Sequence, residues 1–586
     1  MGRAYCIFIV FSLLLCPSIM PYSHYDNPHG FEARYSRQSD EPIVINGNDD
    51  FLTGGWLGNG TEEAPYIISG LEITQTSMPC VSISNTSAYF VITDCVLRGP
   101  NVSIFVGGEI DPSQFSGCVE LTNVKRGVMT RCTLSGFGSA ALIEGCLGTD
   151  LSLCTFTDCY YGIRIRNSDD IIVTICTFGR AEGPPDRNYH GILVEDSSNC
   201  SLKNNVVTGG FLVHNYDYLS LLHAGMTIID SEECAVIQNR FVSSGIRIVG
   251  LPSVSLDNNT VNGLPIVLLD SLVDCEVDAS EYGQLLLTDC ENVTVSGGRF
   301  NKTACGVAFL SCALCSIRAT TVGGSTGGFL LDGCSDCRIA NSTVKDSAIA
   351  CFMWSSTNCS VENTSFINNV VGVEATGSPR TKMGCCAMSD ISRTGVWLFG
   401  CHDSQVKCNS IAQFSLAGVG SQTADPYAGA GRYVSKALIP EAYSSLYLSQ
   451  SNRSLIAGNS LSGFFFGLAL QSSGCAVVNN TISHCSWGIA VRGSGNRIYS
   501  NTLRENGHNA VDNAPGNLWD DGISVGNNWD DYTGIGFYQI GGSAGAVDRF
   551  PNGTNWGPTL SFAGLALVVS LVGLIILLTL RTRRRA

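Results

Sequence analysis

The stretch Ile339–Val344, IANSTV, is one copy of a short motif that recurs along most of the chain. Its central residue, here Ser342, is small or carries an amide, and an apolar residue stands three positions before it and another two positions after it. Seventeen positions share this pattern with no exception at either flank. These central positions are Cys95, Cys132, Cys154, Cys176, Asn205, Asn239, Asn259, Ser280, Gly298, Thr320, Ser342, Thr364, Cys386, Asn409, Asn459, Asn480 and Asn501.

The spacing of the motif indicates a solenoid. Twelve of the sixteen intervals are 18 to 23 residues long, and a fixed period in that range is typical of repeats that each form one turn of a coil. The apolar residues are mainly β-branched or aromatic, and no stretch keeps a helical period, which favours strands. We therefore predict an all-β, right-handed parallel β-helix of about 17 turns, with the handedness taken from the preference of parallel crossovers. At about 4.8 Å per turn the rod is roughly 80 Å long.

Strand alternation places the central residue and the residue two positions later on one face, which we expect to be the interior. Stacked asparagines there can hydrogen-bond in a ladder that leaves no amide unsatisfied. The residue just before each central position then points outward. Four of these outward residues begin Asn-x-Ser/Thr sequons and are candidates for glycosylation, although a repeat rich in Asn, Ser and Thr also produces sequons for structural reasons. They are Asn258, Asn341, Asn363 and Asn479.

The two ends of the chain indicate export and a membrane anchor. Residues 1–22 read as a secretory signal peptide, with Arg3 before an apolar run. Residues 560–580 carry no charge and are long enough for a transmembrane helix, and a tail at 581–586 with four arginines follows. Because positive residues stay on the cytoplasmic side, the β-helix domain at 43–551 is expected outside the cell on a single-pass anchor in the cell membrane.

Charge narrows the range of partners. The formal net charge is −16, and the five arginines of the signal and the tail leave about −21 on the outer part. Such a charge argues against nucleic acid and against polyanions as partners. The membrane is one expected partner, and glycans or other cell-surface molecules are the others.

The 27 cysteines fall on repeat positions. Cys312, Cys315, Cys334 and Cys337 match a zinc-ribbon spacing and are weak candidates for a copper or zinc site. The same spacing follows from the 22-residue period, and Cys is small and often buried, so the structural interpretation is preferred. No cofactor is expected.

Four long intervals contain insertions at one place in the repeat, between the central strand and the next Gly-apolar strand, at roughly 98–116, 179–190, 208–224 and 412–444. All four should emerge along one edge of the rod, where loops on a rigid scaffold can bind or catalyse. Two insertions on consecutive turns carry the polar and aromatic residues suited to sugars. Candidate ligand-binding residues are Arg187, Tyr189, His214, Tyr216, Tyr218 and His223. Weak catalytic candidates are Asp186, Asp217 and His190.

Several further motifs point to a family. They are IVING at Ile43–Gly47, GNGT at Gly58–Thr61, APYII at Ala64–Ile68, NLWDDG at Asn517–Gly522 and GNNWDDYTG at Gly526–Gly534. With the Asn-rich repeats, they make residues 43–551 resemble the NosD-like right-handed β-helix repeat proteins of archaeal and bacterial surfaces. The resemblance implies a right-handed parallel β-helix and hints at carbohydrate-binding or sugar-hydrolase function. The copper role of the namesake is not carried over, because no copper-like ligand cluster supports it.

The end of the repeat domain has a separate role. Trp519, Trp529 and Tyr532 are expected to cap the last coil, which would otherwise expose an unpaired edge.

Two main functions remain open from the sequence, and a surface protein that binds copper or zinc is a third. The first is a membrane-anchored extracellular β-helix that binds carbohydrate or other surface partners, or that serves as a stalk. The second is a polysaccharide hydrolase or lyase on the same scaffold, so the sequence leaves enzymatic activity uncertain. An enzyme needs acidic groups that converge in a groove, whereas a binding protein needs only aromatic and polar contacts. Fold does not decide between them.

Overall fold

The computed structural model describes residues 41–75, 79–99, 105–106, 109–110, 117–136, 138–179, 190–209, 224–250, 253–413 and 443–553. The predicted signal peptide at 1–22, transmembrane segment at 560–580 and tail at 581–586 lie outside these residues. Within the described ranges, no helix is long and apolar enough to cross a membrane. The described chain is built from short strands, and its single described helix is α1, Asn48–Thr53.

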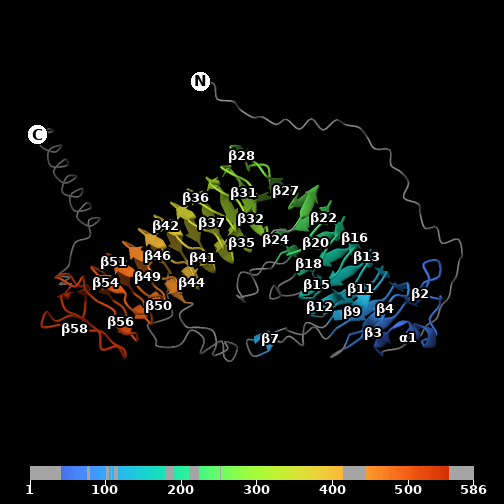
Figure 1. The fold of residues 1–586 in the computed structure, drawn as a ribbon, viewed down its shortest axis with the longest axis horizontal. Coiled ribbons are helices and arrows are strands. Elements are labelled where there is room, and N and C mark those ends of the chain that lie inside the picture. Colours follow the sequence, from blue (N-terminus) through green and yellow to red (C-terminus); the bar gives the residue numbers. More distant parts are fainter. Residues whose placement is uncertain are drawn as a thin grey trace, which may run out of the picture.

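The strands coil into two arms that form an arch (Figure 1). In the first arm, residues 43–261, three parallel sheets run from β1 (Ile43–Asn46) to β24 (Ile246–Val249), from β2 (Tyr66–Ser69) to β25 (Val254–Asp257), and from β3 (Glu72–Thr74) to β26 (Asn259–Val261).

In the second arm, residues 264–553, the three sheets run from β27 (Leu264–Asp270) to β56 (His508–Asp512), from β28 (Glu276–Asp278) to β54 (Arg497–Tyr499), and from β31 (Arg299–Asn301) to β60 (Asn552–Gly553). The prediction of an all-β parallel β-helix is confirmed, with about 19 turns rather than 17.

A hairpin joins the arms and breaks the single rod that the repeat predicts. β26 and β27 pair in antiparallel fashion, with Val261 opposite Leu264, so the third sheet of the first arm continues into the first sheet of the second arm with its strand direction reversed. Alternate residues of a strand face opposite sides. Ile266 and Leu286 accordingly pack into the core of the first arm, whereas Leu285 and Leu287 pack into the core of the second. The shared sheet therefore lies between two hydrophobic cores.

Gln284 closes the edge that this break leaves on β24. Its side-chain oxygen accepts a hydrogen bond from the Ile246 N–H at 3.0 Å, and its amide donates to the Ile246 carbonyl. The fully buried Gln284 thus replaces the backbone of the strand that would have come next. Near the same place the motif fails: Ser280 is exposed, although both of its flanks fit the pattern.

Elsewhere the central residues point inward, as predicted. Buried asparagines form two ladders, in which each amide donates to the next turn's Oδ1 at 2.9–3.0 Å. The members are Asn205, Asn239 and Asn259 in the first arm, and Asn409, Asn459, Asn480, Asn501 and Asn527 in the second. The Nδ2 of Asn239 also donates to the Leu202 carbonyl at 2.9 Å. Both amide protons are therefore satisfied away from water.

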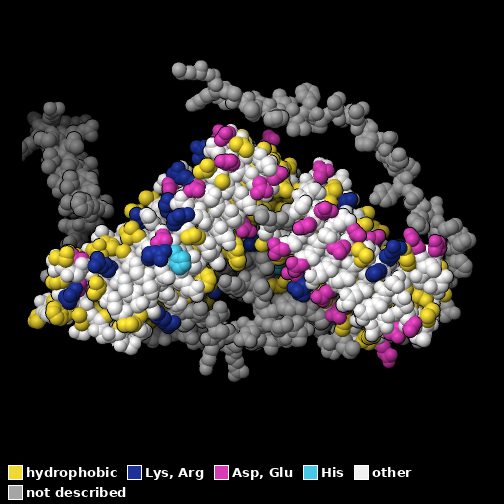
Figure 2. Space-filling model, in the orientation of Figure 1, with side chains coloured by type: hydrophobic (Ala, Val, Ile, Leu, Met, Phe, Trp, Pro, Cys, Tyr) yellow, Lys and Arg dark blue, Asp and Glu magenta, His cyan; other side chains and the backbone are white. Residues whose placement is uncertain are grey.

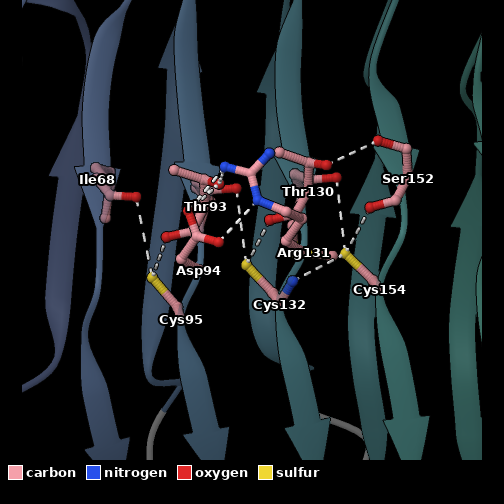
Figure 3. Close-up of polar contacts among 11 residues, drawn as sticks. Ile68, Thr93, Asp94, Cys95, Thr130, Arg131, Cys132, Ser152 and Cys154 are labelled. Carbon is pink, nitrogen blue, oxygen red and sulfur yellow. Dashed lines mark hydrogen bonds and ion pairs between the residues drawn. The ribbon is translucent and has the colours of Figure 1, made fainter. Parts of the chain in front are cut away.

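The residue before each central position explains the frequency of Asn there. The four sequon asparagines are exposed and have left-handed φ values of 52°, 51°, 47° and 56° in the order Asn258, Asn341, Asn363 and Asn479. Asn tolerates that conformation better than most residues. In the cysteine column of the first arm, the same positions hold Asp94 and Arg131, which pair on the outside at 2.8 Å (Figure 3).

Both ends of the coil are closed. Phe51 of α1 is fully buried and stacks on Tyr66 with ring centroids 4.7 Å apart. At the other end Trp519 and Trp529 are fully buried. Their indole N–H groups donate at 2.9 Å, Trp519 to the Asp512 carboxylate and Trp529 to the Asp548 carboxylate.

Each indole fills the end of the core, and a carboxylate from outside the two Trp-Asp motifs, Asp512 or Asp548, satisfies its polar edge. Tyr532 lies beside this core and donates from its hydroxyl to the Gly536 carbonyl at 2.6 Å.

Candidate functional site

The four insertions do share one edge. In each arm they connect a third-sheet strand to the next first-sheet strand. The flanking strands are β6 (Val96–Arg98) and β9 (Gly117–Val124), β17 (Thr177–Gly179) and β18 (His190–Glu195), β20 (Val206–Thr208) and β21 (Met226–Ile229), and β46 (Ser410–Ala412) and β47 (Ser444–Ser449). β26 and β27 are antiparallel neighbours in one sheet. The C-terminal ends of the third-sheet strands in the first arm therefore lie at the same edge as the N-terminal ends of the first-sheet strands in the second arm.

Eight of the nine predicted catalytic and ligand-binding residues lie outside the described residues. These are Asp186, Arg187, Tyr189, His214, Tyr216, Asp217, Tyr218 and His223. Of the candidates on these two insertions, the structure describes only His190.

His190 begins β18 and lies in a packed aromatic cluster. It is 1% exposed, and its ring stacks on Tyr161 with centroids 4.8 Å apart. The Arg164 guanidinium lies 5.5 Å from the centroid of the Tyr161 ring and forms an ion pair with Glu195 at 3.0 Å. A cavity lined partly by His190 holds only about 10 Å³, which is the size of one water and too small for a sugar ring.

The four candidate metal-binding thiols are used within the core. Cys312, Cys315, Cys334 and Cys337 are at most 1% exposed. Each donates to a carbonyl of the preceding turn at 3.3–3.5 Å. Hydrogen bonds among these buried thiols shift their pKa values in opposite directions. The pKa of Cys312 and Cys337 is raised far above the ordinary thiol range, and that of Cys315 and Cys334 is lowered to about 3 and about 4. All four sulfurs are buried and engaged with backbone carbonyls, which favours the structural interpretation over a metal site.

In the part of the chain that the structure describes, no group of three or more His, Cys, Asp or Glu side chains is placed to hold an ion. The described cysteines are free thiols. In the first arm, Cys95, Cys132 and Cys154 form a column whose sulfurs each contact the carbonyl two residues earlier at 3.2–3.3 Å (Figure 3).

A polar groove of about 440 Å³ lies over the first turns of the first arm, at the C-terminal ends of the first-sheet strands. Backbone and side chains from three strands, β1, β4 (Val81–Thr86) and β9, and from the turns after them, form its walls. The lining residues are Asn46, Gly47, Asn48, Asp49, Asn85, Thr86, Ser87, Asn123 and Lys125. The groove is therefore made of amides, hydroxyls and one charge of each sign.

Three of the groove amides form a row along the coil axis. The Nδ2 of Asn85 donates to the Asn46 Oδ1 at 2.8 Å, and the Nδ2 of Asn123 donates to the Asn85 Oδ1 at 3.1 Å. Asn85 and Asn123 occupy left-handed turns with φ of 52° and 51°. The row ends at Gly145, where a Cβ would lie 2.6 Å from the Asn123 Oδ1. Glycine at position 145 therefore leaves room for the Asn123 side chain, the last amide of the row.

Asn48 fixes the second wall of the groove. Its Oδ1 accepts from the Thr86 hydroxyl at 2.6 Å and from the Ser87 N–H at 3.0 Å. The side chains of Asp49 and Lys125 form no hydrogen bond or ion pair with any residue within the described ranges. The groove thus presents a held amide row together with one free acceptor and one free donor.

Sequence reasoning missed this groove. Asn46 lies in the IVING motif, but its alignment with Asn85 and Asn123 depends on the register across β1, β4 and β9. The insertion at 98–116 interrupts the period between the second and third of these strands. The one available signal was an Asn near the end of each of these three strands.

Two family models match the chain, and they meet at the junction of the arms. The right-handed β-helix region model matches residues 79–261 in the first arm. The model described as periplasmic copper-binding protein (NosD) matches residues 266–413 and 350–534 in the second. The change of model falls on the β26–β27 hairpin. A comparison with curated proteins finds no match.

Solved structures match the chain at low similarity. An alginate lyase from Paenibacillus is 12% identical with a TM-score of 0.30, and the match covers 50% of this chain and 99% of the lyase. A tailspike protein of an E. coli bacteriophage in complex with a pentasaccharide is 13% identical with a TM-score of 0.24, over 74% of this chain and 69% of the tailspike.

A surface adhesin of Streptococcus pneumoniae is 10% identical with a TM-score of 0.20, over 54% of this chain and 85% of the adhesin. The stacked parallel sheets, the repeat motif and both family models agree, and the chain is a NosD-like right-handed parallel β-helix protein.

Proposed function

We propose that the protein binds a neutral glycan chain in the groove over Asn46, Asn85 and Asn123, outside the cell and on a single-pass membrane anchor. The observation that carries the proposal is the row of amides on three successive turns. A sugar hydroxyl both donates and accepts, and an amide offers both partners. Sites for such ligands are concave and orient them with a few fixed polar groups.

The direction of the row favours a polymer. Successive turns are about 4.8 Å apart, so repeating sugar units that lie along the axis can meet one turn after another. Tyr89, two positions after the groove residue Ser87, has the Arg126 guanidinium 5.1 Å from its ring centroid and donates to Glu62 at 3.1 Å. An aromatic ring of this kind suits the apolar face of a sugar.

Charge favours a neutral glycan over an acidic one. Asp49 and Lys125 balance each other in the groove, while the whole chain carries a formal charge of −16. A polyanion would approach against that field.

The test uses the full-length protein in lipid nanodiscs, produced in a host without N-glycosylation because Asn85 begins a sequon. A glycan array identifies ligands, and calorimetry measures their affinity. The double variant Asn85→Gly, Asn123→Gly removes both amides but keeps the left-handed turns unstrained. It should bind at least roughly tenfold more weakly, since each hydrogen bond contributes about 0.5–1.5 kcal/mol.

The matched control is Asn341→Gly, Asn363→Gly, which changes exposed left-handed asparagines of the second arm. It should bind like the unmodified protein. Equal losses in both variants, or no glycan retained by the unmodified protein, would contradict the proposal.

The enzymatic alternative is tested in the same preparation. Polysaccharides are incubated with the unmodified protein and with an Asp186→Ala, Asp217→Ala variant, and released product is measured. Product that disappears in the variant would make the protein a hydrolase or lyase. Binding without product supports the binding function alone.

Copper binding is not proposed. The family description names it, but in the described part of the chain the buried thiols donate to backbone carbonyls and no ligand cluster is present.

A further inference from the structure

The terminal turn of the second arm, residues 513–553, exposes apolar side chains that nothing in the fold uses. Ile535 is 84% exposed, Ile523 80% and Phe537 61%. Leu518 and Val525 of the same turn are also exposed. Figure 2 shows hydrophobic side chains at this end of the arch, at the left of the view. Single exposed apolar residues are ordinary on a protein surface, but five within twenty positions form a local concentration.

The side chain of Asp521 holds the loop that carries Ile523. One oxygen of Asp521 accepts the N–H groups of Ile523, Ser524 and Val525 at 2.8, 2.7 and 2.9 Å. These bonds lower the pKa of Asp521. The apolar side chain therefore projects from a turn whose backbone groups are already satisfied, which reduces the cost of moving it out of water.

Ile535 and Phe537 also project from a well-packed part of the turn. Tyr538, next to Phe537, stacks on the buried Trp529 with ring centroids 4.0 Å apart, and its hydroxyl donates to the Asp531 carboxylate at 2.9 Å. Phe537 and Ile535 thus extend from the aromatic cap of the coil and are not needed to close it.

The position of this turn in the chain indicates what it meets. Only residues 554–559 separate Gly553 from the apolar segment at 560–580. Six linking residues reach at most about 25 Å, since an extended chain spans at most about 3.6 Å per residue. If that segment spans the membrane, the terminal turn cannot move away from the bilayer surface.

We propose that the terminal turn rests on the lipid bilayer, with Ile523, Ile535 and Phe537 inserted between the headgroups. This proposal relies on the membrane anchor of the proposed function. Apolar side chains at an interface insert about 5–10 Å into the headgroup region. The contact fixes the end of the second arm against the membrane, and the groove lies at the opposite end of the arch (Figure 1).

The test places a fluorescent amino acid at position 537, 523 or 52 of the full-length protein in phosphatidylcholine nanodiscs that contain spin-labelled lipid. Leu52 of α1 is 69% exposed on the first arm and is the matched control. Quenching should be several-fold stronger at 537 and 523 than at 52. With the probe at 537, Ile523→Ser, Ile535→Ser should lower the quenching, and both changes are at exposed positions that folding does not use.

Retention in the bilayer is measured separately by resistance to alkaline extraction. Retained protein with equal quenching at all three positions would overturn the lipid contact while leaving the anchor intact. Protein that is extracted would overturn both the anchor and the contact. Retained protein with selective quenching supports both.

Discussion

The two arms are built from the same repeat but use it differently. Three of the four insertions and the polar groove belong to the first arm, whereas the second arm keeps intervals of 22 residues from Gly298 to Cys386 without interruption. The inward column of the first arm begins with thiols, and the second arm ends in a five-membered asparagine ladder. Regular stacking supplies stability, and departures from it supply surface chemistry.

The largest expected effect contrasts the two inward columns. Asn480→Ala should destabilise the second arm by roughly 4 kcal/mol, because it removes four buried hydrogen bonds. The Asn480 side chain accepts from the N–H and the Nδ2 of Asn459, and it donates to the Ile456 carbonyl and to the Asn501 Oδ1. Cys154→Ala should cost only about 1 kcal/mol, since a thiol is a weak donor. Hydrogen exchange by mass spectrometry reports each arm separately. Equal losses of stability in the two variants would contradict the difference expected between the asparagine and cysteine columns.

The next effect concerns the junction. Gln284→Ala should cost roughly 2–3 kcal/mol, because it leaves the buried Ile246 N–H and carbonyl unsatisfied. We expect faster hydrogen exchange in β24 and a separation of the two arms into distinct denaturant transitions. Gln471→Ala, at a half-buried glutamine whose side-chain oxygen accepts a hydrogen bond from the Tyr447 hydroxyl at 3.1 Å, is the control and should leave one transition. Unchanged exchange in β24 would show that Gln284 does not seal this edge.

A smaller effect separates two glycines with the same backbone. Gly145 has φ 62° and Gly377 has φ 57°, so alanine at either should cost about 1 kcal/mol. Only at Gly145 would the new Cβ lie 2.6 Å from the Asn123 Oδ1, since at Gly377 the nearest atom is the Ser355 hydroxyl at 3.9 Å. Glycan affinity should therefore fall in Gly145→Ala and stay unchanged in Gly377→Ala. Calorimetry measures the affinity of each variant. An equal loss of affinity in both would mean that the amide row does not bind the glycan.

The smallest effect is on the pH dependence of the terminal turn. Hydrogen bonds from the Arg549 guanidinium, at 2.8 and 2.5 Å, hold the pKa of the buried Asp520 below the ordinary aspartate value of 3.8. A lowered carboxylate pKa stabilises the fold above pH 3.8, and that contribution disappears as the pH falls through the folded pKa.

Hydrogen exchange of residues 520–550 should therefore accelerate below pH 3.8 in the unmodified protein. In Arg549→Gln the pKa of Asp520 should return towards the ordinary value, so exchange should already be faster at neutral pH and should change less between neutral pH and about pH 3. The same pH dependence in both proteins would mean that this pair does not stabilise the turn.

Some structural details followed directly from residue chemistry. The inward asparagines were predictable because a small or amide residue recurs between two apolar positions that must face the core. The outward sequon asparagines follow from the same alternation, and the caps at Trp519 and Trp529 from large aromatic residues where the repeat stops. The candidate site was less accessible, since Asn46, Asn85 and Asn123 become neighbours only through strand register across an insertion.

The sequence by itself determined the parallel β-helix, its inward columns and the common edge of the insertions, because a fixed period and strand alternation are local properties. Only the tertiary structure decided that the rod divides into two arms. The interval from Asn259 to Ser280 is 21 residues, within the regular range, and both flanks of Ser280 fit the motif. The hairpin forms there because β27 can bury both of its faces, Ile266 in one core and Leu269 against the other. That choice depends on the packing of both arms at once.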